Sequence, residues 1–383
     1  MIVLISVISF AVWMYLIAFH GRFWRSGPVL DAETSSSTAK VAVVVPARNE
    51  AESIGRSVGS LLAQDYAGEL SVLVVDDNST DGTGEIAASV GIELGAGGRL
   101  TVIQGEPLPA GWSGKLWAVH QGLSHAKAVA ADYVLLTDAD IEHEAKHISA
   151  LVSKAERDGL ELASEMVRLH CESFAERALI PAFVFFFQML YPFVWVADPA
   201  RRVAGAAGGT MLVARTALDR IEGVERIRGR LIDDCALARE IKSTGGRIWL
   251  GHAELARSVR VYPSWRDVWK MIARTAYEQL RYSPLMLLGC VLGMGVIYCA
   301  PPLLALFAHG SANDGLARGL GILAWLMMAA AFQPTLRRYR RSPLWGAALP
   351  CIGLFYLCAT VDSALRYYSG RGGGWKSRVY SAE

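Results

Sequence analysis

The sequence has few of the patterns that build metal or redox centres. Its six cysteines form no C-x-x-C pair, and four of them lie inside apolar stretches: Cys290, Cys299, Cys351 and Cys358. Among its eight histidines, His143 and His147 stand at i and i+4, but without an H-E-x-x-H pattern. The sequence therefore argues against a zinc site, a disulfide framework and a zinc protease.

A large excess of charge of one sign is also missing. The net charge is +2, which gives no general electrostatic attraction to nucleic acid, and we expect no nucleic-acid partner. Apolar residues, in contrast, make up 52% of the chain. This share is high for a soluble protein and indicates that part of the chain lies in a membrane.

The N-terminal segment has the length and composition of a membrane anchor. Residues 1–20 are mostly apolar, lack the basic start and the cleavage site of a signal peptide, and are followed by Arg22 and Arg25. About 20 apolar residues span a bilayer, and basic residues favour its cytoplasmic side. The sequence predicts an uncleaved anchor that leads into a cytoplasmic domain.

Residues 283–366 are predicted to form C-terminal transmembrane helices. Apolar stretches lie at 285–307, 316–332 and 344–361, and four arginines between positions 337 and 341 place the last loop in the cytoplasm. Three crossings would put the basic tail, residues 367–383, outside, where basic residues are disfavoured. The prediction is a multi-pass protein of the inner membrane in which one stretch could be re-entrant or interfacial.

A further apolar segment occupies residues 178–196. It is long enough to cross a bilayer, but Pro181, Gln188 and Pro192 interrupt it. We expect this segment to lie against the membrane or to line a lipid groove.

Residues 38–282 form the predicted domain between the anchor and the C-terminal helices, and in its first half apolar strands alternate with amphipathic helices. Strands are predicted near residues 40–45, 70–75, 100–103 and 133–136. Such alternation is typical of an α/β domain with a parallel, doubly wound sheet and right-handed crossovers.

Two carboxylates, Asp138 and Asp140, follow the fourth strand. Side chains at i and i+2 of an extended segment point the same way, and ligands of open α/β sheets bind beyond the carboxyl ends of the strands. The pair could therefore hold one divalent cation, Mg²⁺ or Mn²⁺, together with a diphosphate. The alternative is a turn in which the aspartates cap their own backbone. His143, three positions further on, could also touch such a site.

A phosphate site is predicted where Gly114 and Lys115 begin a helix. Backbone amides and the helix dipole favour phosphate there, and Lys115 adds a positive charge. The loop is not a Walker loop, because Pro109 stands where G-x-x-x-x-G-K requires a glycine. An ATPase is thereby disfavoured.

Several motifs together resemble the family 2 glycosyltransferases. They are VVVPARNE, which ends at Glu50, VVDDNSTDGT around Asp76, and the motifs that contain Lys115, Asp138-Ala-Asp140 and Asp233-Asp234. They keep the family's order and spacing over residues 40–282. The layout of anchor, catalytic domain and C-terminal helices is similar to that of lipid-directed members such as ceramide glucosyltransferases. Residues 108–118 and 374–380 look closest to the hopene-associated glycosyltransferases of hopanoid-making bacteria.

The resemblance implies a GT-A fold, the Rossmann-like fold of nucleotide-diphospho-sugar transferases. Asp76, at the end of a strand, would bind the uracil base, and Pro46, Ala47 and Glu50 would line the same nucleoside pocket. Glu50 could instead only favour the start of a helix. Lys115 would contact the donor phosphates, while the Asp-x-Asp pair would hold the metal.

The resemblance also assigns the catalytic acids. Asp234 would be the general base that takes the proton from the acceptor hydroxyl, and Asp233 would be a neighbouring or acceptor contact. The alternative is an acidic helix N-terminus that favours the helix dipole. Processive members carry Gln-x-x-Arg-Trp, whereas this chain has Gln279-Leu-Arg281-Tyr. Arg281 or Arg274 could still meet the diphosphate, or either could be an interfacial residue, and processivity is in doubt.

The leading hypothesis is an inverting transferase that moves a sugar from a UDP-sugar to a lipid hydroxyl at the cytoplasmic face of the membrane. The narrower resemblance implies a hopanoid acceptor. One alternative is a polyprenyl-phosphate sugar transferase, for which Arg201 and Arg202 are candidate phosphate ligands. Another is a non-catalytic membrane scaffold, against which the retained carboxylates argue.

Overall fold

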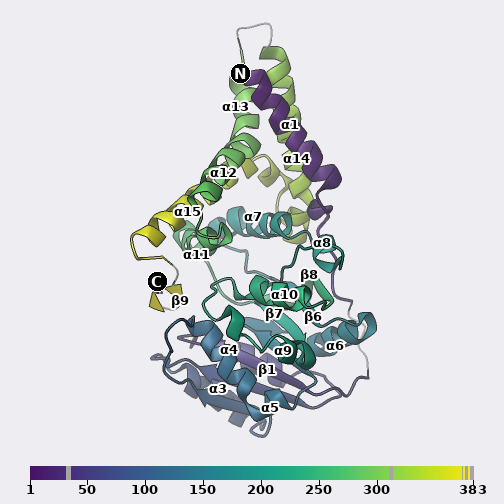
Figure 1. Cartoon of the computed structure of the whole chain (residues 1–383), viewed down its shortest axis with the longest axis vertical. Coiled ribbons are helices and arrows are strands. Elements are labelled where there is room, and N and C mark those ends of the chain that lie inside the picture. The colour runs from purple at the N-terminus through teal and green to yellow at the C-terminus, as the bar shows by residue number, and fades with distance from the viewer. Residues whose placement is uncertain (32–35, 310–313, 373, 376–377, 380–383) are drawn as a thin grey trace.

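The computed structural model describes residues 1–31, 36–309, 314–372, 374–375 and 378–379. It has two parts (Figure 1). The body is an α/β unit with a single large sheet, and the stalk is a bundle of long helices that extends from one side of it.

The first half of the body confirms the predicted βα alternation. Four neighbouring strands run parallel to one another: β1 (Val41–Ala47), β2 (Leu70–Asp76), β3 (Leu100–Gln104) and β4 (Tyr133–Thr137). The two faces of β1 contribute to different cores, with Val44 packed in the cluster of helix α4 (Gly114–Ser124) and Val43 in that of helix α2 (Ile54–Leu62). Burial on both faces explains why this strand reads as a continuous apolar run.

The second half of the sheet is mixed, and the predicted parallel arrangement concerned only the first four strands. The full strand order is β3-β2-β1-β4-β7-β6-β8-β5. Strand β7 (Thr210–Ala214) runs antiparallel to both β4 and β6 (Leu162–Arg168), and β5 (Ile141–His143) runs antiparallel to β8 (Ile248–Ser258). An apolar run does not encode strand direction, so the sequence could not show this. The reversal places the start of β7 at the edge where β4 ends.

Two helices lie between body and stalk: α7 (Phe174–Leu190) and α11 (Trp265–Gln279). The apolar segment predicted at 178–196 forms α7 and the short helix α8 (Phe193–Ala197). Helix α7 continues through Pro181, and it is not one of the helices long and apolar enough to cross a membrane. The expectation that this segment lies against the membrane stays a prediction.

Four helical stretches have the length and composition of membrane spans in the described part of the chain: Ile2–Phe19 (α1), Pro284–Phe307 (α12 to α13), Asp314–Arg338 (α14) and Leu349–Tyr368 (α15). The first three reach the far end of the stalk, whereas α15 runs obliquely beside α11 and ends near the body (Figure 1). Trp269 of α11 donates a 2.6 Å hydrogen bond to Asp362 of α15, which also pairs with Arg366. Helix α15 therefore packs against α11 and is bonded to it, unlike the three helical stretches that reach the far end of the stalk.

The tail folds back toward the body. Its short strands β9 (Gly374–Trp375) and β10 (Arg378–Val379) form an antiparallel pair. The remaining residues of the motif at 374–380 lie outside the described residues.

Candidate active site

The site lies at the edge of the sheet where β1, β2 and β4 end. A cavity of about 620 Å³ opens there. Its charged wall includes most of the predicted site residues together with one that was not predicted: Glu50, Lys115, Asp138, Asp140, Asp233, Asp234 and Arg260. The fold thus brings together charged side chains from five separate segments of the chain.

Lys115 links the two acidic motifs. Its ammonium nitrogen lies 2.9 Å from Asp138 Oδ1 and 3.1 Å from Asp233 Oδ2. Helix α4 places it there, because Ser113 caps the helix by accepting a hydrogen bond from the Leu116 amide. Burial of Lys115 opposes its charge, but the carboxylates of Asp138 and Asp233 outweigh this and raise its pKa. Lys115 therefore stays cationic at the centre of the site.

Asp234 is held with its carboxylate toward the cavity. Its Oδ2 accepts a 2.8 Å hydrogen bond from the Gly208 amide, and Oδ1 accepts one of 2.6 Å from the Cys235 amide. Burial, and then the charge of Asp233, raise the pKa of Asp234 to about 6. A carboxylate with this pKa is ionised at neutral pH and is basic enough to take a proton from an acceptor.

Asp140 is held by an arginine that the sequence did not single out. Arg260 donates from Nε to Asp140 Oδ2 at 2.9 Å, and from a terminal nitrogen to Glu50 Oε1 at 2.6 Å. Ser258 Oγ also donates to Asp140 Oδ2, at 3.0 Å. Burial raises the pKa of Asp140 although the nearby Arg260 lowers it. Ser258 and Arg260 stand at the end of β8, a strand that was missed, so no sequence pattern pointed to them.

The residues present fit a divalent cation held jointly with a diphosphate. Asp138 and Asp140 both line the cavity, and the bonds to Asp140 fall on Oδ2, which leaves Oδ1 as a ligand. Among the described residues, no group of three or more His, Cys, Asp or Glu side chains is arranged to hold a metal alone. Two carboxylates with further oxygens from phosphate and water are a usual arrangement for Mg²⁺.

The predicted nucleoside residues lie at the same edge. Pro46 and Glu50 line the cavity, and Ala47 ends β1 in register with Asp76 at the end of β2. Asp76 is buried and is not among the lining residues; its Oδ1 accepts a 2.9 Å hydrogen bond from the Ser79 amide. Asp76 thus lies on β2, the strand next to β1, at the same edge of the sheet as the cavity. Its role in binding the base stays a prediction.

Three of the predicted arginines do not line the cavity. Arg281 follows the end of α11 and does not line the cavity, whereas Arg274 of the same helix does. Arg201 is exposed and stacks on Trp195 at 5.0 Å, and the neighbouring Arg202 is exposed as well. Arg274 is therefore the better candidate for an anion ligand.

His143 belongs to the core and not to the cavity. It contacts Thr137 Oγ1 at 3.1 Å and His147 at 2.8 Å, and His147 in turn contacts Glu165 at 2.7 Å. All three titratable groups are buried. Burial lowers the pKa of His147 to about 3 and raises that of Glu165 to about 8. The network is a buried hydrogen-bonded chain with no net charge, placed behind the strand that ends at Asp138.

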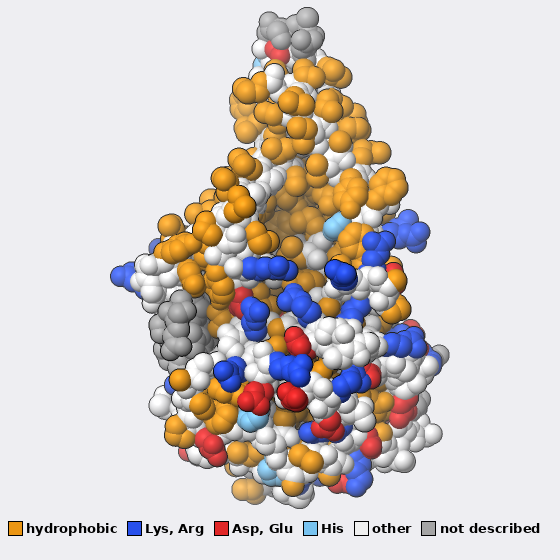
Figure 2. All heavy atoms as spheres, in the orientation of Figure 1, with side chains coloured by type: hydrophobic (Ala, Val, Ile, Leu, Met, Phe, Trp, Pro, Cys, Tyr) orange, Lys and Arg blue, Asp and Glu red, His pale blue; other side chains and the backbone are white. Residues whose placement is uncertain are grey.

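The wall of the cavity toward α7 and α11 is apolar with a basic rim. The apolar side chains are Met166, Leu169, Phe183, Phe187 and Met271, and the basic ones are Arg230, Lys270 and Arg274. We call these last three the basic trio. Figure 2 shows Lys and Arg side chains gathered where body and stalk meet, beneath a hollow in the apolar surface of the stalk.

The family comparison agrees with this geometry. Residues 42–221 match the model of glycosyl transferase family 2. In curated proteins, the chain is 31% identical over 113 residues to a 4,4'-diaponeurosporenoate glycosyltransferase of Staphylococcus aureus strain USA300, and 30% identical over 132 residues to that of strain MRSA252. These alignments cover 29% and 34% of this chain and 27% and 32% of the relatives, so the chain matches about a third or less of their length.

A solved structure resembles nearly the whole chain. It is mannosyltransferase PcManGT from Pyrobaculum calidifontis in complex with GDP-Man and Mn²⁺, with a TM-score of 0.57 and 21% identity over 95% of this chain and 99% of that one. At this identity the likeness shows the fold, which is the predicted GT-A fold with apolar helices at both ends. The family match lies within the body, and the strand order and the converging carboxylates agree with a glycosyltransferase domain there.

Proposed function

We propose that this protein is an inverting glycosyltransferase that moves a sugar from a nucleotide-sugar to a lipid acceptor at the cytoplasmic face of a membrane. The observation that carries the proposal is the composition of the cavity. Acids and Lys115 that suit a metal-bound diphosphate share one cavity with an apolar wall from α7 and α11. A sugar donor and a greasy acceptor can therefore meet in it.

Each side chain has a task in such a transfer. Asp138 and Asp140 would hold the cation, which supplies charge neutralisation for the leaving diphosphate. Lys115 would add a second positive charge on the same side, since it lies 2.9 Å from Asp138. Asp234 would accept the proton of the acceptor hydroxyl as that oxygen attacks the anomeric carbon. Asp76 would bind the base and make the donor a UDP-sugar.

The apolar helices would place the cavity beside a membrane, from which the lipid acceptor could reach it. The helices of the stalk carry many exposed apolar side chains, among them Leu4, Leu292 and Leu326, which suit a bilayer. The cavity wall that includes Phe183 and Phe187 belongs to α7, which lies between body and stalk, where the head group of a membrane lipid would be within reach. Three spans, with α15 beside α11, would keep Arg366 and Arg371 at the end of α15 on the side of the body, as the positive-inside rule favours.

The direct test is a transfer assay on the purified full-length protein in lipid nanodiscs. The protein is incubated with radiolabelled UDP-sugars, Mn²⁺ and a lipid extract. Labelled lipids are then separated and identified by mass spectrometry. We expect a hydroxylated polycyclic lipid of the hopanoid class to be labelled. If no lipid takes up label while UDP still stabilises the protein, the acceptor assignment is wrong. If neither UDP nor any other nucleoside diphosphate binds, the proposal of a glycosyltransferase activity is wrong.

The basic trio favours a second candidate, a polyprenyl-phosphate sugar transferase. Arg230, Lys270 and Arg274 line the cavity, and within the described residues no ion pair with a carboxylate is formed by any of them. A phosphate on the acceptor would satisfy them. Farnesyl phosphate and farnesol distinguish the two cases, because only the phosphate gives a product whose sugar is released by mild acid.

A further inference from the structure

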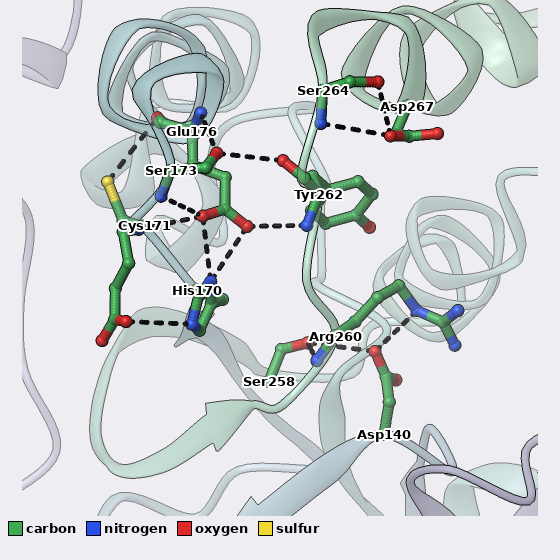
Figure 3. Close-up of polar contacts among 11 residues, drawn as sticks. Asp140, His170, Cys171, Ser173, Glu176, Ser258, Arg260, Tyr262, Ser264 and Asp267 are labelled. Atoms are coloured by element: carbon green, nitrogen blue, oxygen red, sulfur yellow. Dashed lines mark hydrogen bonds and ion pairs between the residues drawn. The ribbon is translucent and has the colours of Figure 1, made fainter.

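Arg260 is placed at the donor site by contacts on both sides of it in the chain. Before it, the Val259 amide donates to the Asp140 carbonyl at 2.8 Å. After it, the Tyr262 amide donates to Glu176 Oε1 at 2.6 Å, and Ser173 Oγ donates to the Tyr262 carbonyl at 3.1 Å (Figure 3). The segment that carries Arg260 is thereby fastened to the sheet at one end and to α7 at the other.

Glu176 of α7 holds the backbone that follows Arg260 in place. It is fully buried, and its carboxylate accepts hydrogen bonds from the amides of Glu172 and Ser173 at 2.9 and 2.8 Å and contacts His170 at 2.9 Å. These bonds, together with that from Tyr262, hold its pKa at about 2 despite burial. Glu176 is therefore a charged, fully bonded carboxylate that fixes the path of residues 260–264.

The guanidinium of Arg260 bridges two carboxylates of the donor site. It contacts Asp140 at 2.9 Å and Glu50 at 2.6 Å, while Asp138 stands two residues from Asp140. Among the acidic lining residues Glu50, Asp138, Asp140, Asp233 and Asp234, ion pairs are formed with Lys115 and Arg260, while the basic trio forms the rim toward α11. Arg260 thus offsets one negative charge at the point where a metal ion would bind.

We propose that Arg260 is a positioning residue that sets how tightly the donor site binds its divalent cation. It orients the carboxylate of Asp140 and, through its charge, weakens the attraction of the acidic cluster for the free ion. The cation then binds tightly only together with the diphosphate, whose negative charge compensates for that of Arg260. The inference rests on the proposed function to the extent that the donor site uses a divalent cation.

The test measures Mn²⁺ binding to the full-length protein without nucleotide, by calorimetry and by loss of the electron paramagnetic resonance signal of free Mn²⁺. We expect Arg260→Gln to bind Mn²⁺ about tenfold more tightly, because removing a positive charge next to the ligands strengthens their field. Arg257→Gln is the matched control, since Arg257 lies three residues earlier and pairs with Glu142 at 3.0 Å outside the cavity. Its Mn²⁺ affinity should match that of the wild type.

Glu50→Gln gives an independent arm if Arg260→Gln does not fold. It removes a negative charge from the same cluster, so Mn²⁺ should bind about tenfold more weakly. Equal or weaker Mn²⁺ binding by Arg260→Gln, equal or tighter binding by Glu50→Gln, or no binding by any form would overturn the inference. The titration contains neither sugar nor lipid, so failure of the proposed transfer reaction would leave its result interpretable.

Discussion

The Gly208 amide donates a 2.8 Å hydrogen bond to Oδ2 of Asp234, and this bond joins the loop before β7 to the start of helix α10 (Asp233–Ser243). A Cβ on Gly208 would lie 3.4 Å from the same oxygen and 3.3 Å from the Lys115 ammonium. Glycine therefore lets the backbone approach both groups closely. The bond aims a carboxylate that the proposed reaction uses as its base.

Asp234→Asn tests that role. The amide keeps the shape but cannot accept the proton, so turnover should fall about 10²- to 10⁴-fold. Binding of UDP with Mn²⁺, measured by calorimetry, should change little, because Asp234 is not among the proposed donor ligands. Equal losses of turnover and of UDP affinity would contradict a base and would indicate a donor contact.

The activity should also depend on pH through Asp234. Its pKa is raised to about 6, and the base works only when ionised. The transfer rate at saturating substrates should therefore fall as pH drops below about 6, by about tenfold per pH unit. Initial rates between pH 5 and 8 measure this. A rate that is flat down to pH 5 would show that Asp234 does not titrate in this range or is not the base.

Phe183→Ala and Phe187→Ala test the acceptor wall. Both side chains line the cavity, and their loss should raise the KM for the lipid acceptor about tenfold while the KM for the donor stays within twofold. Phe174→Ala on the same helix is the control, because Phe174 is 78% exposed and does not line the cavity. A parallel rise in the donor KM would place the donor, not the acceptor, against α7.

Glu176→Gln should destabilise the protein in a pH-dependent way. The folded pKa of about 2 lies below the value of about 4.5 expected unfolded. The stabilisation is thus fully present above pH 4.5 and is lost as pH falls toward 2. The substitution should lower the free energy of unfolding by about 2–3 kcal/mol at pH 7 and by less at pH 3, as measured by chemical denaturation. Glu172→Gln, whose side chain is 79% exposed, should cost little at either pH.

Glu165→Gln tests whether the buried network is neutral. With a pKa of about 8, Glu165 carries its proton at pH 7, so a neutral amide of the same shape should cost less than about 1 kcal/mol. Glu165→Ala removes the partner of His147 and should cost about 2–4 kcal/mol. Equal losses for the two variants would mean that Glu165 is ionised and paired with a charged His147.

Sequence patterns were sufficient to predict the first four strands, because β1 to β4 are short apolar runs bounded by turn residues. Asp138 and Lys115 were placed at one edge of the sheet because a strand ends before Asp138 and a helix begins at Lys115, whereas Asp234 was assigned to the same site by the family resemblance. Arg260 could not be found this way. It follows β8, whose exposed side chains include charged ones and whose partner strand β6 lies 86 residues earlier, from Leu162 to Ile248. Only the folded pairing puts Arg260 beside Asp140.

The position of α15 has a practical consequence for anyone who wishes to study the enzyme in water. Composition alone suggests a soluble fragment that stops near residue 282, where the apolar stretches begin. Such a fragment would lose the partners of Trp269 and Tyr277, namely Asp362 and Ser363, and would bare the face of α11 that α15 covers. Because α11 also supplies Lys270 and Arg274 of the basic trio, trimming the chain there would disturb the region where the acceptor is proposed to bind.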